Sequence, residues 1–427
     1  MTKTKEPRII PTEGYTLHLV ETEKYKTTTI SIQIKRKIEE ENVTKRSLLA
    51  QVLKSGTKSY PSSLHIHRLL EDMYGAGFVT SIAKKGDYQI ITIRMDVSNE
   101  KFLLDNTQLL EQSLDFLAEV LLYPLNDGTK FDESNVKKEK RVLKQKIQSI
   151  YDDKMRFANK RLVEEMFKGQ SYAQHAFGKE EEVESITAEE LFDYYKDVIE
   201  KDEIDIYIIG DINGEEVGRK VQSSLRLNER INTDEAPVQE VTARHQENVV
   251  FDEQDVKQGK LHIGYRTSIT FADPEYYAIQ VFNGIFGGFS HSKLFLNVRE
   301  KASLAYYAVS RIESHVGALF VMSGIEFKNY EKAVSIIKEQ MDHMKSGDIT
   351  DSELSQTKEM IRNQLLESVD NPNSWVDLLY HSRVAGIRRS IDEWIEGIQA
   401  VTMEDIRNVA DTVTLDTIYF LKGEGQK

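Results

Sequence analysis

The same order of predicted elements occurs twice along this chain, and this repetition restricts its possible folds more than any other feature. A helix is predicted to open at residues 133–136 and another at 351–354, both with serine in second place. The segment 186–191 is matched in the same way by 401–406, and each of these precedes an apolar strand. Ser134 and Ser352 are 218 positions apart, and the second pair of segments is offset by 215 positions. Near-constant spacing indicates a duplicated unit, although Thr-x-x-[Glu/Asp] is also a common helix cap.

Apolar periodicity predicts a mixture of strands and helices in each half. In the first half, strands are predicted at 15–20, 27–34, 78–82, 88–97 and 204–209, and helices at 47–54, 63–74, 103–122, 132–168 and 188–198. In the second half, strands are predicted at 259–266, 305–312, 318–325 and 417–421, and helices at 276–285 and 330–345. Clustered strands without strict alternation with helices indicate an α+β fold, in which each half is a mostly antiparallel sheet with helices packed on it.

The two halves are predicted to be separate domains. Residues 228–246 are polar, contain Pro237 and show no periodicity, which is typical of a linker. We therefore expect a first domain at 1–227 and a homologous second domain at 247–427. A chain of 427 residues is long enough for two such cores.

Composition excludes several classes of function. The net charge of -14 argues against nucleic-acid binding, which needs a basic face, and against an anionic membrane surface. The absence of cysteine excludes thiolate chemistry and cysteine-ligated metals. No apolar run approaches the roughly 20 residues of a membrane span, and the polar start of the chain has no apolar region typical of a signal peptide. These features predict a cytoplasmic protein.

Several segments, in order, resemble the insulinase (pitrilysin, inverzincin) zinc peptidases. Residues 47–57 lie where that family has H-x-x-E-H and a following Gly-Thr, and residues 139–146 lie where it has E-[RK]-x-V-x-x-x-E. Residues 286–290 resemble its glycine-rich segment, and residues 299–306 resemble its R-E-x-x-x-L-A-Y element. The resemblance covers nearly the whole chain. It implies two homologous domains that face each other as a clam and enclose a peptide.

The same resemblance implies that the zinc site has been lost. In an inverzincin, two histidines four positions apart bind zinc from one helix face, the glutamate between them activates water, and a distant carboxylate is the third ligand. In this sequence Ser47 and Gln51 occupy the histidine positions, Ala50 the position of the base, and Lys146 that of the third ligand. None of these side chains suits its role. We therefore predict no metal or cofactor in this chain and zinc only in a partner subunit.

Two other groups of polar residues are a histidine-containing group at 65–71 and an acidic pair at 202–203. His65, His67 and Glu71 are the nearest approach to a metal cluster, but His65 and His67 point to different faces of a helix, and exposed helical histidines are the expected outcome. A metal site rebuilt around them stays open as an alternative. Asp202 and Glu203 are predicted to be solvated surface charges.

The resemblance also implies that the second half retains substrate-binding residues. The resemblance assigns Arg299 and Tyr306 to a pair that reaches the substrate from the second domain, and it assigns Gly287 and Gly288 to a glycine-rich substrate loop. Arginine offers a rigid fork of donors to a peptide carbonyl, and tyrosine can donate a hydrogen bond to a carbonyl oxygen as it gains charge. The competing interpretations are an Arg299–Glu300 pair, a core position for Tyr306, and a tight turn between helices at the glycines.

The loss of the zinc site and the retention of Arg299 and Tyr306 together predict a catalytically incomplete subunit. It would supply peptide-binding residues to a homologous, zinc-bearing partner in a heterodimer, with peptides as substrates. Three alternatives stay open: a purely structural core subunit, a homodimeric peptide-binding module, and an enzyme with a rebuilt metal site. An exposed sheet edge in the first domain is expected to capture the peptide backbone.

Overall fold

The computed structural model describes residues 5–105, 107–229 and 247–425, and within it the chain divides into two compact units. The first unit contains Met1–Ser149, Gln174–Ala236 and Asp370–Asp377. The second contains Ile150–Ala173, Pro237–Val369 and Leu378–Lys427. Two short segments thus belong to the unit of the opposite half of the sequence. Most of the predicted linker, from residue 230 to 246, lies outside the described residues.

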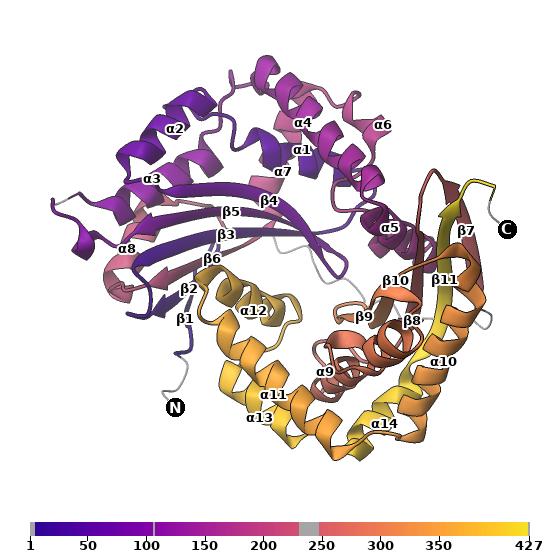
Figure 1. Ribbon diagram of the computed structural model, residues 1–427. Helices are drawn as coiled ribbons and strands as arrows, with labels where there is room; N and C mark the ends of the chain where they lie inside the picture. Colours follow the sequence, from indigo (N-terminus) through magenta and orange to yellow (C-terminus); the bar gives the residue numbers. More distant parts are fainter. Residues whose placement is uncertain (1–4, 106, 230–246, 426–427) are drawn as a thin grey trace. The chain divides into compact units, whose positions relative to one another are not determined.

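The first unit contains a six-stranded sheet in the order β1-β2-β6-β3-β5-β4 (Figure 1). Only β2 and β6 pair in parallel, and the remaining neighbours are antiparallel. The strands are β1 Arg8–Pro11, β2 Thr16–Glu21, β3 Thr27–Lys37, β4 Gly77–Lys85, β5 Tyr88–Ser98 and β6 Glu203–Gly210. On β3, Ile30, Ile32 and Ile34 enter the apolar core, and the alternate residues are polar and buried on the opposite face. This period of two is what a strand requires when its faces differ.

Helices of the first unit pack on the apolar face of this sheet (Figure 1). They are α1 Val43–Val52, α2 Ser63–Asp72, α3 Leu109–Leu122, α4 Glu133–Asp152, α6 Glu180–Val183, α7 Ala188–Lys201 and α8 Gly214–Ser224. Leu48 and Leu49 of α1 and Leu117 of α3 are completely buried in this core. The helix predicted at 132–168 is in fact two helices, because the Asp153 side chain caps a new helix, α5 Lys154–Met166.

The second unit contains a five-stranded sheet in the order β7-β11-β8-β10-β9. The strands are β7 Asn248–Gln254, β8 Gly259–Arg266, β9 Ala305–Glu313, β10 Ala318–Ile325 and β11 Thr414–Gly423. β7 pairs in parallel with β11, and the other pairs are antiparallel. Apart from β1, this is the order and pairing of β2-β6-β3-β5-β4. The predicted duplication and α+β class are therefore confirmed.

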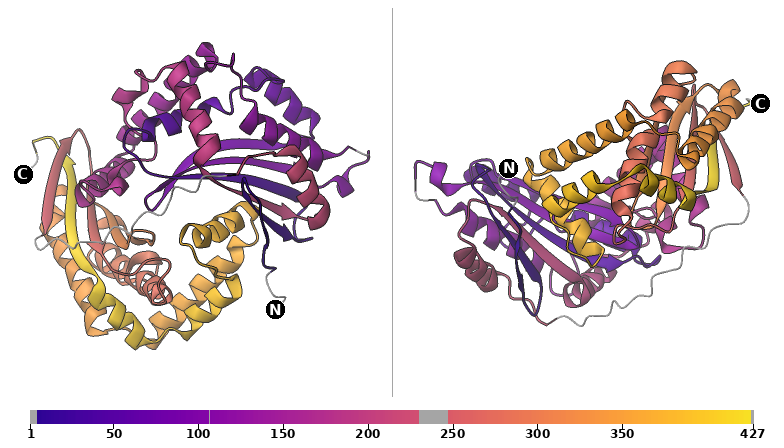
Figure 2. Two further views of the ribbon diagram at one scale, coloured as in Figure 1. Left: turned by 180° about the vertical axis from the view of Figure 1, so that it is seen from behind. Right: turned by 90° about the horizontal axis from the view of Figure 1, so that it is seen from below.

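Both faces of the second sheet are covered by helices. One face packs on a core formed with α9 Tyr276–Asn283, α10 Tyr330–Ser346, α11 Asp351–Ser368, α13 Ile391–Ala400 and α14 Met403–Thr412. On the other face α5 lies across β8 and β11 and covers Phe320, Tyr419 and Leu421 (Figure 1, Figure 2). A further helix, α12 Pro372–Val384, is divided between the two units. No helix within the described residues is both long and apolar enough to span a membrane.

Candidate functional site

Three of the four residues that replace the family's zinc-site residues lie on α1, deep in the first unit. Ser47 and Ala50 are completely buried, and Gln51 is 1% exposed. The hydroxyl of Ser47 has no hydrogen-bond partner among the described residues. Lys146, the fourth position, lies on α4 and is 95 positions from Gln51 along the chain. The fold nevertheless brings the two side chains together.

Lys146 and Gln51 form a direct contact. The Lys146 ammonium donates a hydrogen bond of 2.8 Å to Gln51 Oε1. Burial lowers the pKa of Lys146, and the nearby Lys54 charge lowers it further, whereas Glu139 acts in the opposite direction. A hydrogen bond thus connects the residue at the second histidine position with the residue at the position of the third ligand.

These residues do not fit a zinc ion. A hydroxyl, an amide and an ammonium group offer no imidazole or carboxylate, and the ammonium of Lys146 is directed at the amide oxygen of Gln51. Within the described residues, no group of three or more histidine, aspartate or glutamate side chains could hold a metal. His65 and His67 are both exposed on α2, and His65 Nδ1 lies 2.8 Å from the Ser62 hydroxyl. The alternative of a rebuilt metal site gains no support.

Glu139, the first residue of the family's helical motif, remains buried on α4 with 2% exposure. Its Oε1 accepts a hydrogen bond of 2.7 Å from the Ser55 hydroxyl, just after α1. The Lys138 ammonium lies 3.6 Å from the same oxygen. Glu139 therefore ties α4 to the end of α1, which is a structural role.

A buried ionic cluster fixes the other end of α1, and the sequence prediction for it was wrong. Asp202 was expected to be a solvated surface charge, but it is 2% exposed. It pairs with the buried Arg46 and, at 2.6 Å, with Arg36 Nε. Arg46 also donates to the backbone oxygens of Gln89 and Ile34. Asp202 immediately follows a helix, and its partners lie far away in the sequence, so periodicity alone gave no signal for this cluster.

In the second unit, Arg299 lies in a wide helical turn, Phe295–Lys301, that ends before β9. Its side chain is 43% exposed, and the guanidinium carbon is 4.5 Å from the centre of the Phe295 ring. Arg299 Nε is 3.7 Å from a Glu300 carboxylate oxygen, and the Glu300 side chain is itself 55% exposed. An exposed ion pair at this distance is weak, so it leaves the guanidinium available to a ligand.

Tyr306 lies in a β-bulge on β9, the outer strand of its sheet. The register between β9 and β10 shifts so that Tyr306 and Tyr307 both oppose Gly324. A bulge turns side chains away from their regular alternation. Tyr306 is 82% exposed, and this excludes the core position considered for it. Tyr307 instead lies on the sheet, because a Cβ on Gly324 would be 2.7 Å from its ring.

The glycine-rich segment continues α9 as a wide helical turn, Gly284–Gly288, and is not an open loop. Gly287 is buried, and a Cβ there would lie 2.5 Å from Ser310 Oγ and 2.7 Å from Leu294 Cδ1. Close packing therefore accounts for glycine at position 287. Gly288 is exposed, and contact of either glycine with substrate stays a prediction.

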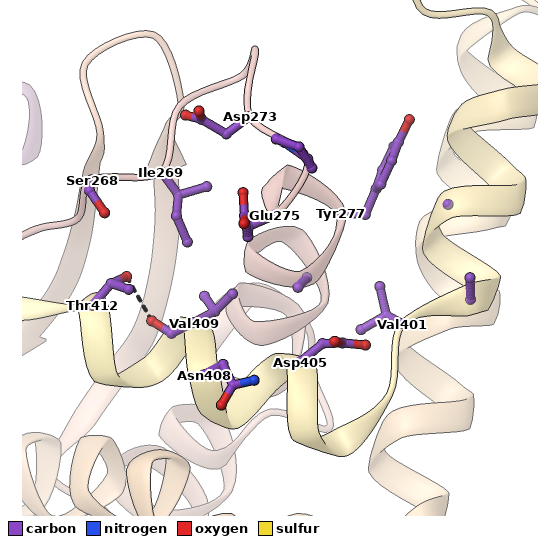
Figure 3. Close-up of a pocket in the computed structure, with 14 residues that line it drawn as sticks. Ser268, Ile269, Asp273, Glu275, Tyr277, Val401, Asp405, Asn408, Val409 and Thr412 are labelled. Carbon is purple, nitrogen blue, oxygen red and sulfur yellow. Dashed lines mark hydrogen bonds between the residues drawn. The ribbon is translucent and has the colours of Figure 1, made fainter.

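A separate pocket of about 820 Å³ in the second unit contains none of the predicted residues (Figure 3). Asp273, Glu275 and Asp405 line it, together with Tyr277. Two of these carboxylates already have structural partners, because Asp273 accepts from the backbone and side chain of Thr270, and Asp405 completes the cap of α14. Two of the acidic side chains in this pocket therefore stabilise a turn and a helix end.

The fold and the former metal positions together define a homologue of two-domain metallopeptidases whose own zinc ligands are missing. Residues 47–180 match the family model described as insulinase (peptidase family M16), and residues 185–361 match the one described as the peptidase M16 inactive domain. The chain therefore belongs to the insulinase family of peptidases, and it lacks the family's H-x-x-E-H motif.

Individual relatives agree with this assignment. The chain is 47% identical over 414 residues to a "probable inactive metalloprotease", YmfF of Bacillus subtilis, with 96% of each chain covered. It is 25% identical to an "uncharacterized zinc protease", YmxG of the same organism, with 87% of this chain and 91% of that one covered. A crystal structure of a conserved protein from Enterococcus faecalis superimposes with a TM-score of 0.89 at 32% identity and covers 99% of this chain and 100% of the other.

Proposed function

We propose that this chain is the non-catalytic subunit of a heterodimeric, cytoplasmic insulinase-type peptidase. In this proposal a zinc-bearing homologue carries out hydrolysis, and this chain presents Arg299 and Tyr306 to the bound peptide. The observation that carries the proposal is the exposure of Tyr306: a tyrosine 82% exposed in a bulge contributes little to the core of its own unit. Its orientation is explained by a ligand outside that core.

The chemistry of the pair supports a role in peptide binding. The Arg299 guanidinium can donate two parallel hydrogen bonds to peptide carbonyl oxygens, and its stacking on Phe295 limits its rotational freedom. The Tyr306 hydroxyl can donate a hydrogen bond to the oxygen that gains negative charge during hydrolysis. Neither group can activate water, so both depend on a metal-bearing partner for the reaction.

The first unit offers an edge for the peptide backbone. β4 is an outer strand of its sheet, and it contacts α1, which carries the former zinc positions. The hydroxyl of Thr80 on β4 donates 2.7 Å to the backbone oxygen of Ala50 on α1. An extended peptide added to β4 would gain main-chain hydrogen bonds with little sequence preference.

The test is steady-state hydrolysis of a fluorescence-quenched peptide by this chain reconstituted with a zinc-bearing homologue. Arg299→Ala is expected to lower kcat by about a hundredfold, the usual effect of removing one transition-state donor. Arg407→Ala, an exposed arginine on α14, is the matched control and should leave turnover unchanged. Unchanged kinetics in Arg299→Ala would remove Arg299 from the mechanism. Hydrolysis by the purified chain alone would contradict the whole proposal.

Two alternative assemblies predict different results in the same preparation. A purely structural subunit would tolerate Arg299→Ala and Tyr306→Phe together. A homodimeric peptide-binding module would show twice the mass of one chain and no change on addition of the zinc-bearing homologue. Mass measurement in solution, with and without that homologue, therefore separates these two assemblies from the heterodimer.

A further inference from the structure

A second group of polar side chains lies next to the Tyr306 bulge and has no assigned role. It surrounds a pocket of about 470 Å³ within the second unit, which we call the lysine pocket. Lys260, Gln258 and Tyr307 line it from the sheet side, and Lys154 lines it from the start of α5. Lys257 and two aspartates, Asp153 and Asp255, complete its polar lining. The lysines outnumber the aspartates in a chain whose net charge is -14.

The sheet side of the lysine pocket is organised around Gly324. This glycine opposes Lys260 on β8 and the two bulge tyrosines on β9. A Cβ at position 324 would lie 2.7 Å from the Tyr307 ring and 3.0 Å from Gln258 Oε1, so only glycine admits both neighbours. The Lys260 ammonium is 5.7 Å from the centre of the Tyr307 ring and donates 2.8 Å to Gln258 Oε1. Packing thus brings three polar side chains together over one glycine.

The Tyr307 hydroxyl is available to donate a hydrogen bond to a ligand. The Tyr307 hydroxyl is buried, and among the described residues it has no hydrogen-bond partner. Burial raises the pKa of Tyr307 to about 12, so the hydroxyl keeps its proton at neutral pH. A buried hydroxyl without a partner is unfavourable, which is a reason to expect a partner outside the chain.

The two inner lysines have neutral acceptors only. Lys154 donates to Gln254 Oε1 at 2.7 Å and to the backbone oxygen of Tyr151, and neither it nor Lys260 forms an ion pair within the described part of the chain. The nearby Asp153 carboxylate is occupied at the cap of α5, where it accepts from the backbone of Met155 and Arg156. Half-buried ammonium groups that form no ion pair can bind an anion.

Burial is the larger influence on Lys260 and lowers its pKa, whereas the Asp153 carboxylate acts in the opposite direction. His262 follows Lys260 on the same face of β8 and is completely buried. Its pKa falls to about 3 because of burial first and the charges of Lys260 and Arg311 next. The imidazole is therefore neutral at pH 7, and the two charges that lower its pKa are both positive. An anionic group would offset these charges.

We propose that the lysine pocket binds a carboxylate of the bound peptide, with Lys260 and Tyr307 as its donors. That the ligand is a peptide rests on the proposed function, because Tyr306 in the same bulge is the residue assigned to the substrate. Both a C-terminal carboxylate and an acidic side chain have the required chemistry. The subunit would thus favour acidic over neutral peptides at a position next to Tyr306.

The test measures peptide binding to the purified full chain without any partner. Fluorescence anisotropy compares an acidic peptide with its C-terminally amidated form and with its Glu→Gln form. We expect an affinity loss of about tenfold for whichever substitution removes the bound carboxylate, and this identifies its source. Equal affinity for all three peptides would overturn the proposal, as would no measurable binding of any of them.

Two variants assign the contact to the proposed donors. Tyr307→Phe keeps the ring on Gly324, and Lys260→Met keeps the length of the chain; each should abolish the preference for the acidic peptide. Lys332→Met, an exposed lysine on α10 on the other face of the sheet, should retain it. Retention of the preference in both pocket variants contradicts the proposal. The melting temperature of Tyr307→Phe should stay the same or rise, whereas a purely structural hydroxyl would make it fall.

This experiment separates the two proposals. If Arg299→Ala slows the heterodimer but the three peptides bind equally, the proposed function stands and the lysine pocket does not bind carboxylates. If no zinc-bearing homologue becomes active with this chain, a tenfold preference for the acidic peptide still assigns the pocket.

Discussion

The two units share one sheet topology, but the regions that correspond to the family's motifs differ in opposite ways. In the first unit, Ser47, Ala50 and Gln51 are buried, and Lys146 donates a hydrogen bond to Gln51. In the second unit, Arg299 and Tyr306 are exposed, and the ion pair between Arg299 and Glu300 is weak. At the first region two distant side chains are joined by a hydrogen bond, whereas at the second region the side chains remain open to solvent.

The two topologically equivalent edge strands show the same contrast. β4 in the first unit pairs regularly with β5 over its whole length. β9 in the second unit is interrupted by the bulge at Tyr306 and Tyr307. Duplication alone would have produced two similar edges, so the bulge is a specific feature of the second unit, and bulges are over-represented next to functional sites.

The largest expected effect concerns the buried ionic cluster at the start of α1. Asp202→Ala leaves Arg46 and Arg36 without their shared carboxylate and should lower the free energy of unfolding by about 3–5 kcal/mol. Urea denaturation measures this loss. Asp193→Ala, which removes an exposed carboxylate from α7, is the control and should change stability by less than about 0.5 kcal/mol. Similar midpoints for both variants would show that the cluster is not what stabilises the first unit.

The contrast predicts that the first unit can be converted back to a metal site. Ser47→His, Gln51→His and Lys146→Glu together should produce stoichiometric zinc binding, measured by metal analysis after dialysis. The two histidine substitutions without Lys146→Glu should bind zinc about a hundredfold more weakly, because the ammonium repels the cation. Equal zinc content in the two variants would mean that Lys146 does not lie at the third ligand position.

Acid should act on the second unit through His262. Its pKa is lowered to about 3, whereas in the unfolded chain it titrates near 6.5. The unfolded state therefore binds the additional proton, and the stabilising contribution is complete above pH 6.5 and is lost as the pH falls toward 3. Between pH 7 and 5 the wild type should lose about 2 kcal/mol more than His262→Leu. Denaturation curves of the two proteins that shift in parallel with pH would contradict this prediction.

The smallest expected effect completes the comparison. Tyr306→Phe removes a hydroxyl from a side chain that is 82% exposed, and the free energy of unfolding should change by less than about 0.5 kcal/mol. The same variant should slow peptide hydrolysis by the reconstituted heterodimer. Thermal denaturation and turnover, measured on one preparation, check both statements. A marked loss of stability would return Tyr306 to a structural role.

Local patterns in the sequence were sufficient for the repeat and most elements of the fold. The helix predicted at 47–54 is α1 Val43–Val52, and the strand predicted at 204–209 is β6 Glu203–Gly210. Thr187 and Thr402, which defined one of the repeated pairs, both form complete capping boxes. Such features depend on neighbouring residues, and therefore a single sequence contains them.

Contacts between distant residues could not be predicted in this way. The Lys146–Gln51 hydrogen bond joins positions 95 apart, and the bulge depends on the pairing of β9 with β10. The break between α4 and α5 has no proline or glycine to mark it; only the Asp153 side chain caps the second helix. The transfer of α5 to the second unit follows from that break and was also not predicted.

The position of α5 has a consequence for synthesis on the ribosome. This helix leaves the ribosome with the first half of the chain, yet the sheet face that it covers includes β11, which ends at Gly423. Its apolar residues, Leu162 and Met166 among them, therefore have no complete binding surface until translation is nearly finished. A nascent chain that pauses before β11 would present this helix to chaperones and to other unfinished chains.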